Sequence, residues 1–373
     1  MEREKFDRGK PYNGLFFLPP SKDIENNPAI LKRLVAASRA LATVNGNLNR
    51  LPNPLMLINT LALQEAKAST EIENIFTTED ELYKAVSETH NESNINPAIK
   101  EVLKYREALW AGFKELQINN KIDESLIKKI FNQIKETSSG YRSPHSQVVI
   151  KRGESEFRSG EVVYTPPRAE GLIKKLMVNL IDYLNNDDLY PTDPLLKMCV
   201  AHYQFEAIHP FQDGNGRTGR ILNLLYLFSK GLLCQPVLYM SKFIILNKED
   251  YYYNLGAVTQ RNSWESWIEF MLEATEKTSL LTNSRINDIL SQMNSTLEYG
   301  KDKIKWYNKE VNEVIFSQPY IKPKVIGDLL GKTSRTTLTK YMNELVINKI
   351  LSQKKDGVEV YYVNDDLIRI LEG

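Results

Sequence analysis

The sequence predicts a mainly α-helical protein with three parts: a helical N-terminal region, a helical core interrupted by one β-hairpin flap, and a C-terminal winged helix-turn-helix. Three observations lead to this fold class. Apolar residues recur at helical spacing over most of the chain. Before residue 305, β-like runs are confined to 147–150 and 162–164. In the tail, two short helical segments precede a strand, an Asp-Gly turn and a second strand.

The composition limits the class of protein. A chain of 373 residues is expected to form two or three domains. Hydrophobic residues make up 42% of it, enough for packed cores, and 48 basic against 47 acidic residues argue against polyanion binding by the chain as a whole. Cys199 and Cys234 lie in apolar helical contexts, which predicts buried, reduced thiols without a disulfide or metal site.

The N-terminal region is expected over residues 1–115. It has no apolar leader, and no apolar stretch of the chain nears 18 residues, so the sequence predicts a soluble, cytoplasmic protein with no membrane partner. Residues 1–30 are rich in Pro and Asn and are predicted to be extended. Helices are predicted over 31–44, about 55–76 and about 99–116.

The core is expected over residues 116–285. A helix is predicted over 126–134, followed by the two β-like runs, and Pro166-Pro167 ends the second run because proline cannot continue a ladder. Further helices are predicted over 172–184, about 248–260 and 264–277, with a glycine-rich stretch after 194–208. Residues 286–304 are predicted to be a linker.

The tail, residues 305–373, reads as a separate module. Helices are predicted over 323–330 and 334–345 around a turn at 331–333, with Ser334 as a candidate cap. Strands are predicted over 351–354 and 358–363 around Asp356-Gly357, an order that resembles a winged helix. The second helix offers Arg335, Thr336, Thr337, Thr339 and Lys340, and residues 321–350 hold six basic against two acidic residues. DNA binding and protein contact are both compatible with this pattern.

The stretch from His209 to Arg220 holds the most concentrated chemistry in the chain. Gly214-Asn215-Gly216 can turn consecutive backbone N–H groups inward, and the apolar run after it has helical spacing, so these groups lie at a helix N-terminus. Arg217 and Arg220 share a helical face and can clamp phosphate oxygens. Asp213 is a suitable Mg²⁺ ligand, and His209 has a pKa suited to proton abstraction. The residues therefore predict a phosphate site with a base beside it.

These twelve residues fit the signature His-x-Phe-x-(Asp/Glu)-Gly-Asn-Gly-Arg-x-x-Arg without a gap, and the chain thereby resembles the Fic (filamentation induced by cAMP) family. The resemblance implies a protein adenylyltransferase that transfers AMP from ATP to a Ser, Thr or Tyr hydroxyl. It makes His209 the general base, Asp213 the Mg²⁺ ligand, and Arg217 and Arg220 ligands of the β- and γ-phosphates. Relatives that transfer phosphate carry Lys where this chain has Gly216, which favours AMP transfer.

A second pattern lies on the predicted helix at 55–76. Ser69 to Asn74 matches the family's inhibitory pattern (Ser/Thr)-x-x-x-Glu-(Gly/Asn), with Ser69 and Glu73 on one helical face. The resemblance implies that Glu73 pairs with Arg220 and displaces the γ-phosphate from its productive position. The same glutamate could instead orient a water for removal of AMP, and the sequence leaves both open.

Two weaker features complete the predicted site. By resemblance, the flap over residues 141–150, which includes Val148, Val149 and Ile150, pairs with the target by β-augmentation, although an ordinary surface hairpin fits equally. Tyr251 and Tyr252 resemble the family's adenine-side aromatics, but core packing is as plausible for them.

The prediction as a whole is autoinhibited AMP transfer from Mg²⁺·ATP to a target protein and to the protein itself. A homodimer and DNA are further possible partners. A de-adenylylase or phosphotransferase on the same core, and a DNA-binding regulator that only senses nucleotide, are the alternatives. The complete set of base, metal ligand and clamp argues against a pure regulator, since sensing ATP needs no positioned imidazole.

Overall fold

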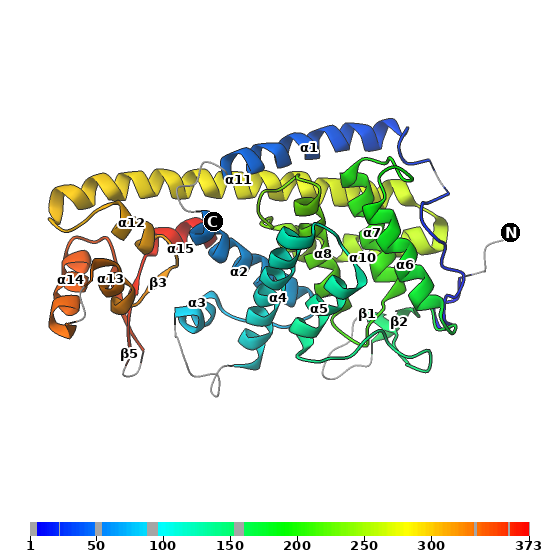
Figure 1. The fold of residues 1–373 in the computed structure, drawn as a ribbon, viewed down its shortest axis with the longest axis horizontal. Coiled ribbons are helices and arrows are strands. Elements are labelled where there is room, and N and C mark those ends of the chain that lie inside the picture. Colours follow the sequence, from blue (N-terminus) through cyan, green and yellow to red (C-terminus); the bar gives the residue numbers. More distant parts are fainter. Residues whose placement is uncertain are drawn as a thin grey trace.

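The computed structural model describes residues 6–21, 23–48, 54–87, 96–152, 160–331, 334–356 and 359–372. The fold is mainly helical, as predicted, with two small antiparallel sheets (Figure 1). None of the described helices is long and apolar enough to cross a membrane. The elements are α1 (Pro28–Leu48), α2 (Pro54–Ile72), α3 (Glu79–Ser87), α4 (Pro97–Asn119), α5 (Glu124–Lys135), β1 (Ile150–Arg152), β2 (Glu161–Tyr164), α6 (Leu172–Asn185), α7 (Pro194–Ile208), α8 (Asn215–Ser229), α9 (Met240–Leu246), α10 (Lys248–Arg261), α11 (Trp264–Lys303), α12 (Lys309–Ile315), β3 (Tyr320–Ile321), α13 (Pro323–Leu330), α14 (Arg335–Ile347), β4 (Ser352–Asp356), β5 (Glu359–Val363) and α15 (Asp365–Glu372).

Helices α1 and α11 form a layer along one side of the molecule (Figure 1). Helix α1 begins earlier than predicted because Pro28 suits the first helical turn and Asn27 Oδ1 accepts hydrogen bonds from the N–H groups of Ala29 and Ile30. Its buried side chains recur at helical spacing along the face toward α11: Ala37, Leu41, Val44 and Leu48.

Helix α11 corrects one prediction. Its 40 residues run without a break to Lys303, so the interval predicted as a linker, 286–304, is helical almost throughout. After the predicted end at residue 277, Ile286 and Ile289 still recur at helical spacing and are fully buried. No proline interrupts the stretch, and its glycine, Gly300, lies in the last turn. The segment predicted as a linker therefore has an apolar stripe that packs like that of any amphipathic helix.

Helix α7 lies at the centre of the core. Every residue from Leu195 to Ile208 is buried, because α6, α8 and α11 surround the helix. Trp267 of α11 is fully buried against it and donates from Nε1 to Cys199 O over 2.8 Å. The extended N-terminal segment is fastened to the same core, where Gln204 Nε2 donates to Phe16 O over 2.8 Å. This packing fixes the end of α7, and the loop that follows it.

The flap hairpin is shorter than predicted on its first strand. Strands β1 and β2 pair antiparallel, with Ile150 opposite Tyr164 and Arg152 opposite Glu161. Residues 147–149 were expected in the strand but precede it, and the guanidinium of Arg168 donates to Val148 O over 2.9 Å. A side chain therefore satisfies a carbonyl that a strand partner would otherwise take. Residues 153–159, between the strands, lie outside the described residues.

The C-terminal module has the predicted order of two helices and a hairpin. Helix α13 matches its predicted bounds, and α14 begins after Ser334, whose side chain makes no capping hydrogen bond, contrary to expectation. Strands β4 and β5 pair as a hairpin that closes at Asp356 opposite Glu359. Parts of both connections lie outside the described residues: Lys332 and Thr333 between the helices, and Gly357 and Val358 between the strands. The two-residue strand β3 was not predicted and completes a sheet of order β3-β5-β4.

Helix α3, which follows α2, contacts this module. Asp80 Oδ1 lies 2.5 Å from Lys354 Nζ of β4, and Lys84 Nζ lies 2.5 Å from Asp356 Oδ2. The Tyr320 hydroxyl of β3 also donates to Asp80. The rings of Tyr83 and Tyr320 are stacked with their centroids 6.2 Å apart. The C-terminal module is thus joined to the N-terminal region by charged and aromatic contacts.

Candidate functional site

The glycine-rich stretch links two helices of the core. His209 is the C-cap of α7 with φ 49°, and Gly214 is the N-cap of α8 with φ 77°. The left-handed conformation at Gly214 explains the need for glycine there. The first backbone N–H groups of α8 have no partner within the helix and are free to bind an anion at its N-terminus. The histidine and an anion-binding helix end are therefore held at the two ends of one short loop.

Asn215 closes this loop with its side chain. Its Oδ1 accepts from Phe211 N over 2.8 Å and its Nδ2 donates to Phe211 O over 2.9 Å. Phe211 itself is fully buried and stacks on Phe131 of α5 with ring centroids 3.9 Å apart. The side chain of Asn215 thus holds the loop, and its backbone N–H at the start of α8 suits the phosphate binding that the sequence predicted for this residue.

Arg142 is a site residue that sequence reasoning did not assign. Its side chain is buried, and it donates from Nε to His209 O over 2.7 Å and from Nη2 to Pro167 O over 2.7 Å. Its backbone N–H donates to Pro210 O over 2.8 Å. A single arginine thus fastens the start of the loop to the segment after the flap. An isolated arginine in a polar stretch carries no signal of such a role.

The imidazole of His209 is neutral at physiological pH. Burial, with a further contribution from the charge of Arg142, lowers its pKa to about 4. A neutral imidazole has a free lone pair that can accept a proton. This is the protonation state that the predicted general base requires.

Asp213 is exposed at the rim of the loop and is paired with a lysine. Its Oδ2 lies 2.6 Å from Lys135 Nζ at the end of α5, and its Oδ1 accepts from Gly214 N over 2.6 Å. Partial burial acts to raise the pKa of Asp213, but the bonds from Lys135 outweigh it and the pKa lies below its usual value. Lys135 also was not assigned from the sequence.

The loop offers one carboxylate, that of Asp213, as a ligand for a Mg²⁺ ion. No group of three or more His, Cys, Asp or Glu side chains that could hold a metal occurs among the described residues. An ionised, accessible carboxylate fits the usual mode of Mg²⁺, which takes one or two carboxylates together with substrate phosphates and water. The donor set of Asp213 therefore suits a metal that arrives with a nucleotide.

The two predicted constellations meet at Arg220. Its Nη2 lies 2.7 Å from Glu73 Oε1 and 2.9 Å from Ser69 O, and its Nε donates to Ser69 Oγ over 2.8 Å. Arg220 is 3% exposed. Burial acts to lower its pKa, but the charge of Glu73 outweighs this and raises the pKa. A Cβ added to Gly216 would lie 2.4 Å from Glu73 Oε1, so the carboxylate rests directly on this glycine.

The turn after α2 holds Glu73 in place. Asn74 has φ 62°, in the left-handed region that asparagine tolerates, and its Oδ1 accepts from Lys248 Nζ of α10 over 3.0 Å. Burial lowers the pKa of Lys248. Asn74 therefore contributes a backbone turn and a contact to α10, and Lys248 is a further residue that the sequence pattern did not indicate.

Arg217 is paired with a different carboxylate. Its Nη1 donates to Glu101 of α4, and its side chain is only 3% exposed. Glu101 lies outside both sequence patterns. The two arginines predicted to clamp phosphate thus each contact one glutamate from the N-terminal region.

The two predicted adenine-side tyrosines differ. Tyr251 is 2% exposed, its hydroxyl lies 2.9 Å from His202 Nε2, and its ring packs beside Trp267 and Phe270. A ring enclosed in this way has no open face for a base, so the structure supports the packing alternative for Tyr251. Tyr252 packs edge-on against Tyr251 and is 37% exposed, which leaves part of its ring accessible.

The flap residues lie near the loop. Val148, Val149 and Ile150 are each half-buried, and of the three only Ile150 belongs to β1. Ser146, just before them, donates to Gln212 Oε1 of the loop over 2.7 Å. The segment leading into β1 therefore contacts the same loop that carries His209 and Asp213.

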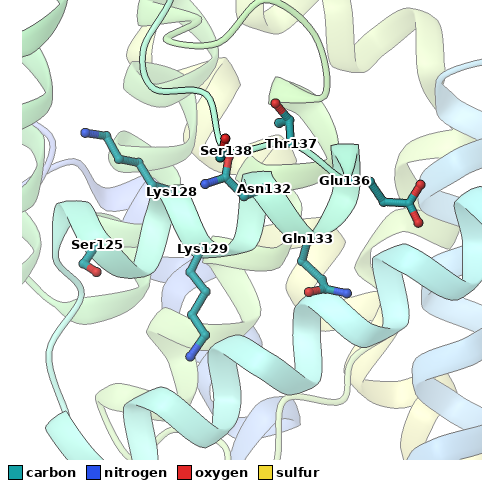
Figure 2. Close-up of a pocket in the computed structure, with 8 residues that line it drawn as sticks. All are labelled: Ser125, Lys128, Lys129, Asn132, Gln133, Glu136, Thr137 and Ser138. Atoms are coloured by element: carbon teal, nitrogen blue, oxygen red, sulfur yellow. The ribbon is translucent and has the colours of Figure 1, made fainter.

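A hollow that is open to solvent lies elsewhere, on α5. It has a volume of about 830 Å³ on the outer face of α5 and contains no residue of the loop (Figure 2). Figure 2 shows the polar side chains that line it: Ser125, Lys128, Lys129, Asn132, Gln133, Glu136, Thr137 and Ser138. It is open to solvent, and its size alone does not make it the site.

Three family descriptions match the chain. "Fic/DOC family N-terminal" matches residues 31–114, "Fic/DOC family" matches 121–227, and "Protein adenylyltransferase SoFic-like, C-terminal domain" matches 292–367. The chain belongs to the Fic family. The match over 121–227 contains the whole loop of this Fic protein, from His209 to Arg220.

Relatives and solved structures agree with this membership. Protein adenylyltransferase Fic of Drosophila mojavensis is 27% identical to this Fic protein over 184 residues, which are 48% of this chain and 35% of the relative. The chain thus spans about a third of the length of that curated relative. A Fic family protein from Desulfovibrio desulfuricans G20 has the same fold, with a TM-score of 0.57, 22% identity and coverage of 93% of this chain and 98% of its own. A Fic domain protein from Bacteroides thetaiotaomicron has a TM-score of 0.51, 18% identity and coverage of 69% and 97%.

Proposed function

We propose that this Fic protein transfers AMP from ATP to a hydroxyl group of a protein. The observation that carries the proposal is the arrangement of one loop: a neutral imidazole, an ionised carboxylate, a helix N-terminus and two buried arginines. The curated relatives are named protein adenylyltransferases, which supports the same reaction. ATP and a target protein are the partners that this activity requires.

The reaction uses His209 as a general base. The acceptor oxygen forms a bond to the α-phosphorus of ATP, the bond from that phosphorus to the bridging oxygen breaks, and diphosphate leaves. The proton of the acceptor hydroxyl passes to the neutral imidazole, whose place at the end of the rigid α7 fixes its approach. Arg142 acts through the loop backbone and keeps His209 at that place.

The phosphates are bound by groups that are already in position. The N–H groups at the start of α8 bind anionic oxygens, and Arg217 and Arg220 neutralise the leaving diphosphate. Asp213 is the ligand through which Mg²⁺ would be held, and the metal would stabilise the charge that develops on the phosphates. Lys135, which now contacts Asp213, would give up one of that residue's oxygens.

We propose further that Glu73 inhibits the reaction. Its carboxylate occupies Arg220 and lies on Gly216, at the start of α8 where a terminal phosphate would bind. Displacement of Glu73 would free one N–H of Arg220 Nη2, while Ser69 still accepts from Nε and Nη2 and orients the guanidinium. The exposed edge of the flap would align the target segment. The protein itself would be among the targets, and a second copy of the chain would then supply that segment.

Labelled ATP tests the proposed reaction. With the full chain carrying Glu73→Gly, ATP labelled at the α-phosphate should label protein, whereas ATP labelled at the γ-phosphate should not. Labelling only from the γ-phosphate would instead support phosphoryl transfer. Loss of label from modified protein, without new ATP, would support the de-adenylylase alternative.

For the C-terminal module we propose DNA contact as a second function. Helix α14 buries Met342 and Leu345 and leaves Arg335, Thr336, Thr339 and Lys340 exposed. An exposed basic and hydroxyl-rich helix face suits phosphate and base contacts. Binding of the full chain to duplex DNA should weaken steeply with salt, and Arg335→Ala with Lys340→Ala should flatten that dependence. Absence of binding at low salt would favour the protein-contact alternative.

A cytoplasmic location is part of this proposal. Both cysteines are free thiols, and burial raises the pKa of Cys199 and of Cys234. Free, unreactive thiols suit a reducing compartment, which also supplies ATP.

A further inference from the structure

The two signature arginines use their donors differently. Arg220 has both Nε and Nη2 engaged, by Ser69 and Glu73. Arg217 has its Nη1 engaged by Glu101, while its Nε is buried and has no hydrogen-bond partner among the described residues. A buried donor without a partner is costly, and at a functional site it indicates a position that a ligand completes. Arg217 therefore keeps one edge of its guanidinium available although the other is paired.

The elements that carry the two glutamates also differ. Glu73 lies in the turn just after the last residue of α2, Ile72. Glu101 lies within α4, which packs closely along α8: a Cβ on Gly112 would approach Leu225 Cδ1 to 2.5 Å, and the rings of Phe113 and Phe228 meet edge-on at 4.6 Å. A turn at a helix end can move away at low cost, whereas a position inside two packed helices cannot.

The surroundings of Glu101 keep its charge in place. Lys104 Nζ lies 3.4 Å from Glu101 Oε1 and 3.0 Å from Glu136 Oε2, so the carboxylate belongs to a small network on α4 and α5. Partial burial acts to raise the pKa of Glu101, but the contact with Arg217 outweighs it and the pKa lies below its usual value. The Glu101 carboxyl is therefore ionised at neutral pH, and it stays where α4 holds it.

From this geometry we infer that Glu101 is a positioning residue, which holds Arg217 so that its unpaired Nε edge receives the diphosphate part of the nucleotide. The inference rests on the proposed function. Glu73 and Glu101 then have opposite roles: Glu73 competes with a phosphate for Arg220, and Glu101 remains paired with Arg217 while the phosphate binds. Removing the charge of Glu101 leaves the buried guanidinium of Arg217 without its fixed partner. The guanidinium then loses its orientation and binds polyphosphate less tightly.

Nucleotide binding tests this inference without catalysis. In the full chain carrying Glu73→Gly, the dissociation constants for ATP and for AMP would be measured by titration calorimetry, with and without Glu101→Gln. We expect the constant for ATP to rise by about tenfold and that for AMP to stay within about twofold, since AMP has no β- or γ-phosphate. The matched control is Glu107→Gln on the same helix, where Glu107 accepts a hydrogen bond from Gln133 Nε2 over 3.2 Å; it should change neither constant.

Two outcomes would overturn the inference. Tighter ATP binding by Glu101→Gln would make Glu101 a competitor of phosphate like Glu73, and an equal loss for ATP and AMP would make it merely structural. Glu101→Asp, which keeps the charge on a shorter chain, should recover part of the ATP affinity, and it decides the matter if the glutamine variant does not fold. If the Glu73→Gly parent itself binds no ATP, the proposed function fails instead.

Discussion

Glu73 Oε1 lies 2.7 Å from Arg220 Nη2, although 147 residues separate the two along the chain. The contact joins the end of α2 to the first turns of α8, and it passes directly over Gly216. A buried arginine that lost this carboxylate would need another anion, and the terminal phosphate of ATP is the anion that the proposed function supplies. The pair therefore links inhibition and substrate binding through one guanidinium.

Replacing Glu73 by glycine should increase self-modification. The variant removes the carboxylate, frees one N–H of Arg220 Nη2 and leaves Ser69, which accepts from Nε and Nη2, to orient the guanidinium. Because most substitutions near an active site lower activity, a gain has few competing explanations. Incorporation of label from α-labelled ATP into the full chain, at saturating ATP, measures it.

Two controls accompany this variant. Addition of His209→Ala should cancel the gain, and Arg220→Ala should not reproduce it, since it breaks the same ion pair but also removes a phosphate ligand. Equal labelling of wild type and Glu73→Gly, with both proteins folded, would refute inhibition by this carboxylate.

Replacing His209 by alanine in the Glu73→Gly background should abolish AMP transfer, a loss of at least about a hundredfold, while ATP still binds. The physical reason is that the loop is held by Arg142 and Asn215 through backbone atoms, so the anion site does not depend on the imidazole. Comparing turnover with the dissociation constant for ATP separates the two effects. A variant that keeps most of its transfer activity would exclude His209 as the base.

The sequence predicted the parts of the site that are encoded locally. The spacing of Ser69 and Glu73 placed them on one helical face, and the family resemblance implied that Glu73 pairs with Arg220. The structure brings all three into contact. Arg142 and Glu101 were missed because their partners lie 67 and 116 residues away and no local spacing marks them. Tertiary pairing of single charged residues leaves no periodic signal.

The same limit applies to the fold. Residues 286–304 were predicted to be a linker after a helix ending at 277, but the apolar stripe of α11 continues through Ile286 and Ile289. The enclosure of Tyr251 beside His202 and Trp267 also depends on how α7, α10 and α11 pack, which a list of aromatic residues does not specify.

Glu206 should make the stability of the fold depend on pH. Burial raises its pKa to about 7, above the usual value of 4.5, although the charge of Arg220 acts to lower it. The folded state binds this proton more tightly than the unfolded state. The contribution of protonated Glu206 to the free energy of unfolding is therefore complete below about pH 4.5 and is lost as the pH rises through about 7. Glu206→Gln cannot ionise and should escape this loss.

The measurement is the difference in Tm between Glu206→Gln and wild type across that pH range. The Tm of Glu206→Gln minus that of wild type should increase by a few degrees from about pH 5 to about pH 8. Glu65, whose pKa burial also raises to about 7, is present in both proteins and cancels. A difference that is constant with pH would mean that Glu206 does not titrate in this range.

The last prediction concerns the contact between α3 and the C-terminal module. Asp80 pairs with Lys354 of β4 and accepts the Tyr320 hydroxyl of β3, and these bonds outweigh the effect of partial burial and hold the pKa of Asp80 below its usual value. Asp80→Ala would remove a partner of Lys354 and of Lys84, whose Nζ lies 2.8 Å from Asp80 Oδ2, and the acceptor of the buried Tyr320 hydroxyl. A surface ion pair contributes about 1 kcal/mol or less, but the two pairs and the hydrogen bond to Tyr320 act together.

Hydrogen exchange of the full chain would locate the effect. Exchange should rise in α3 and in β4 and β5 of the Asp80→Ala variant, and stay unchanged in α7, which lies in the central core. Lys355→Ala is the matched control, because this neighbour of Lys354 on β4 is exposed. If the control raises exchange as much as Asp80→Ala, the effect belongs to the hairpin itself. If neither variant changes exchange in α3, the stacked rings of Tyr83 and Tyr320 hold the two parts together without the charges.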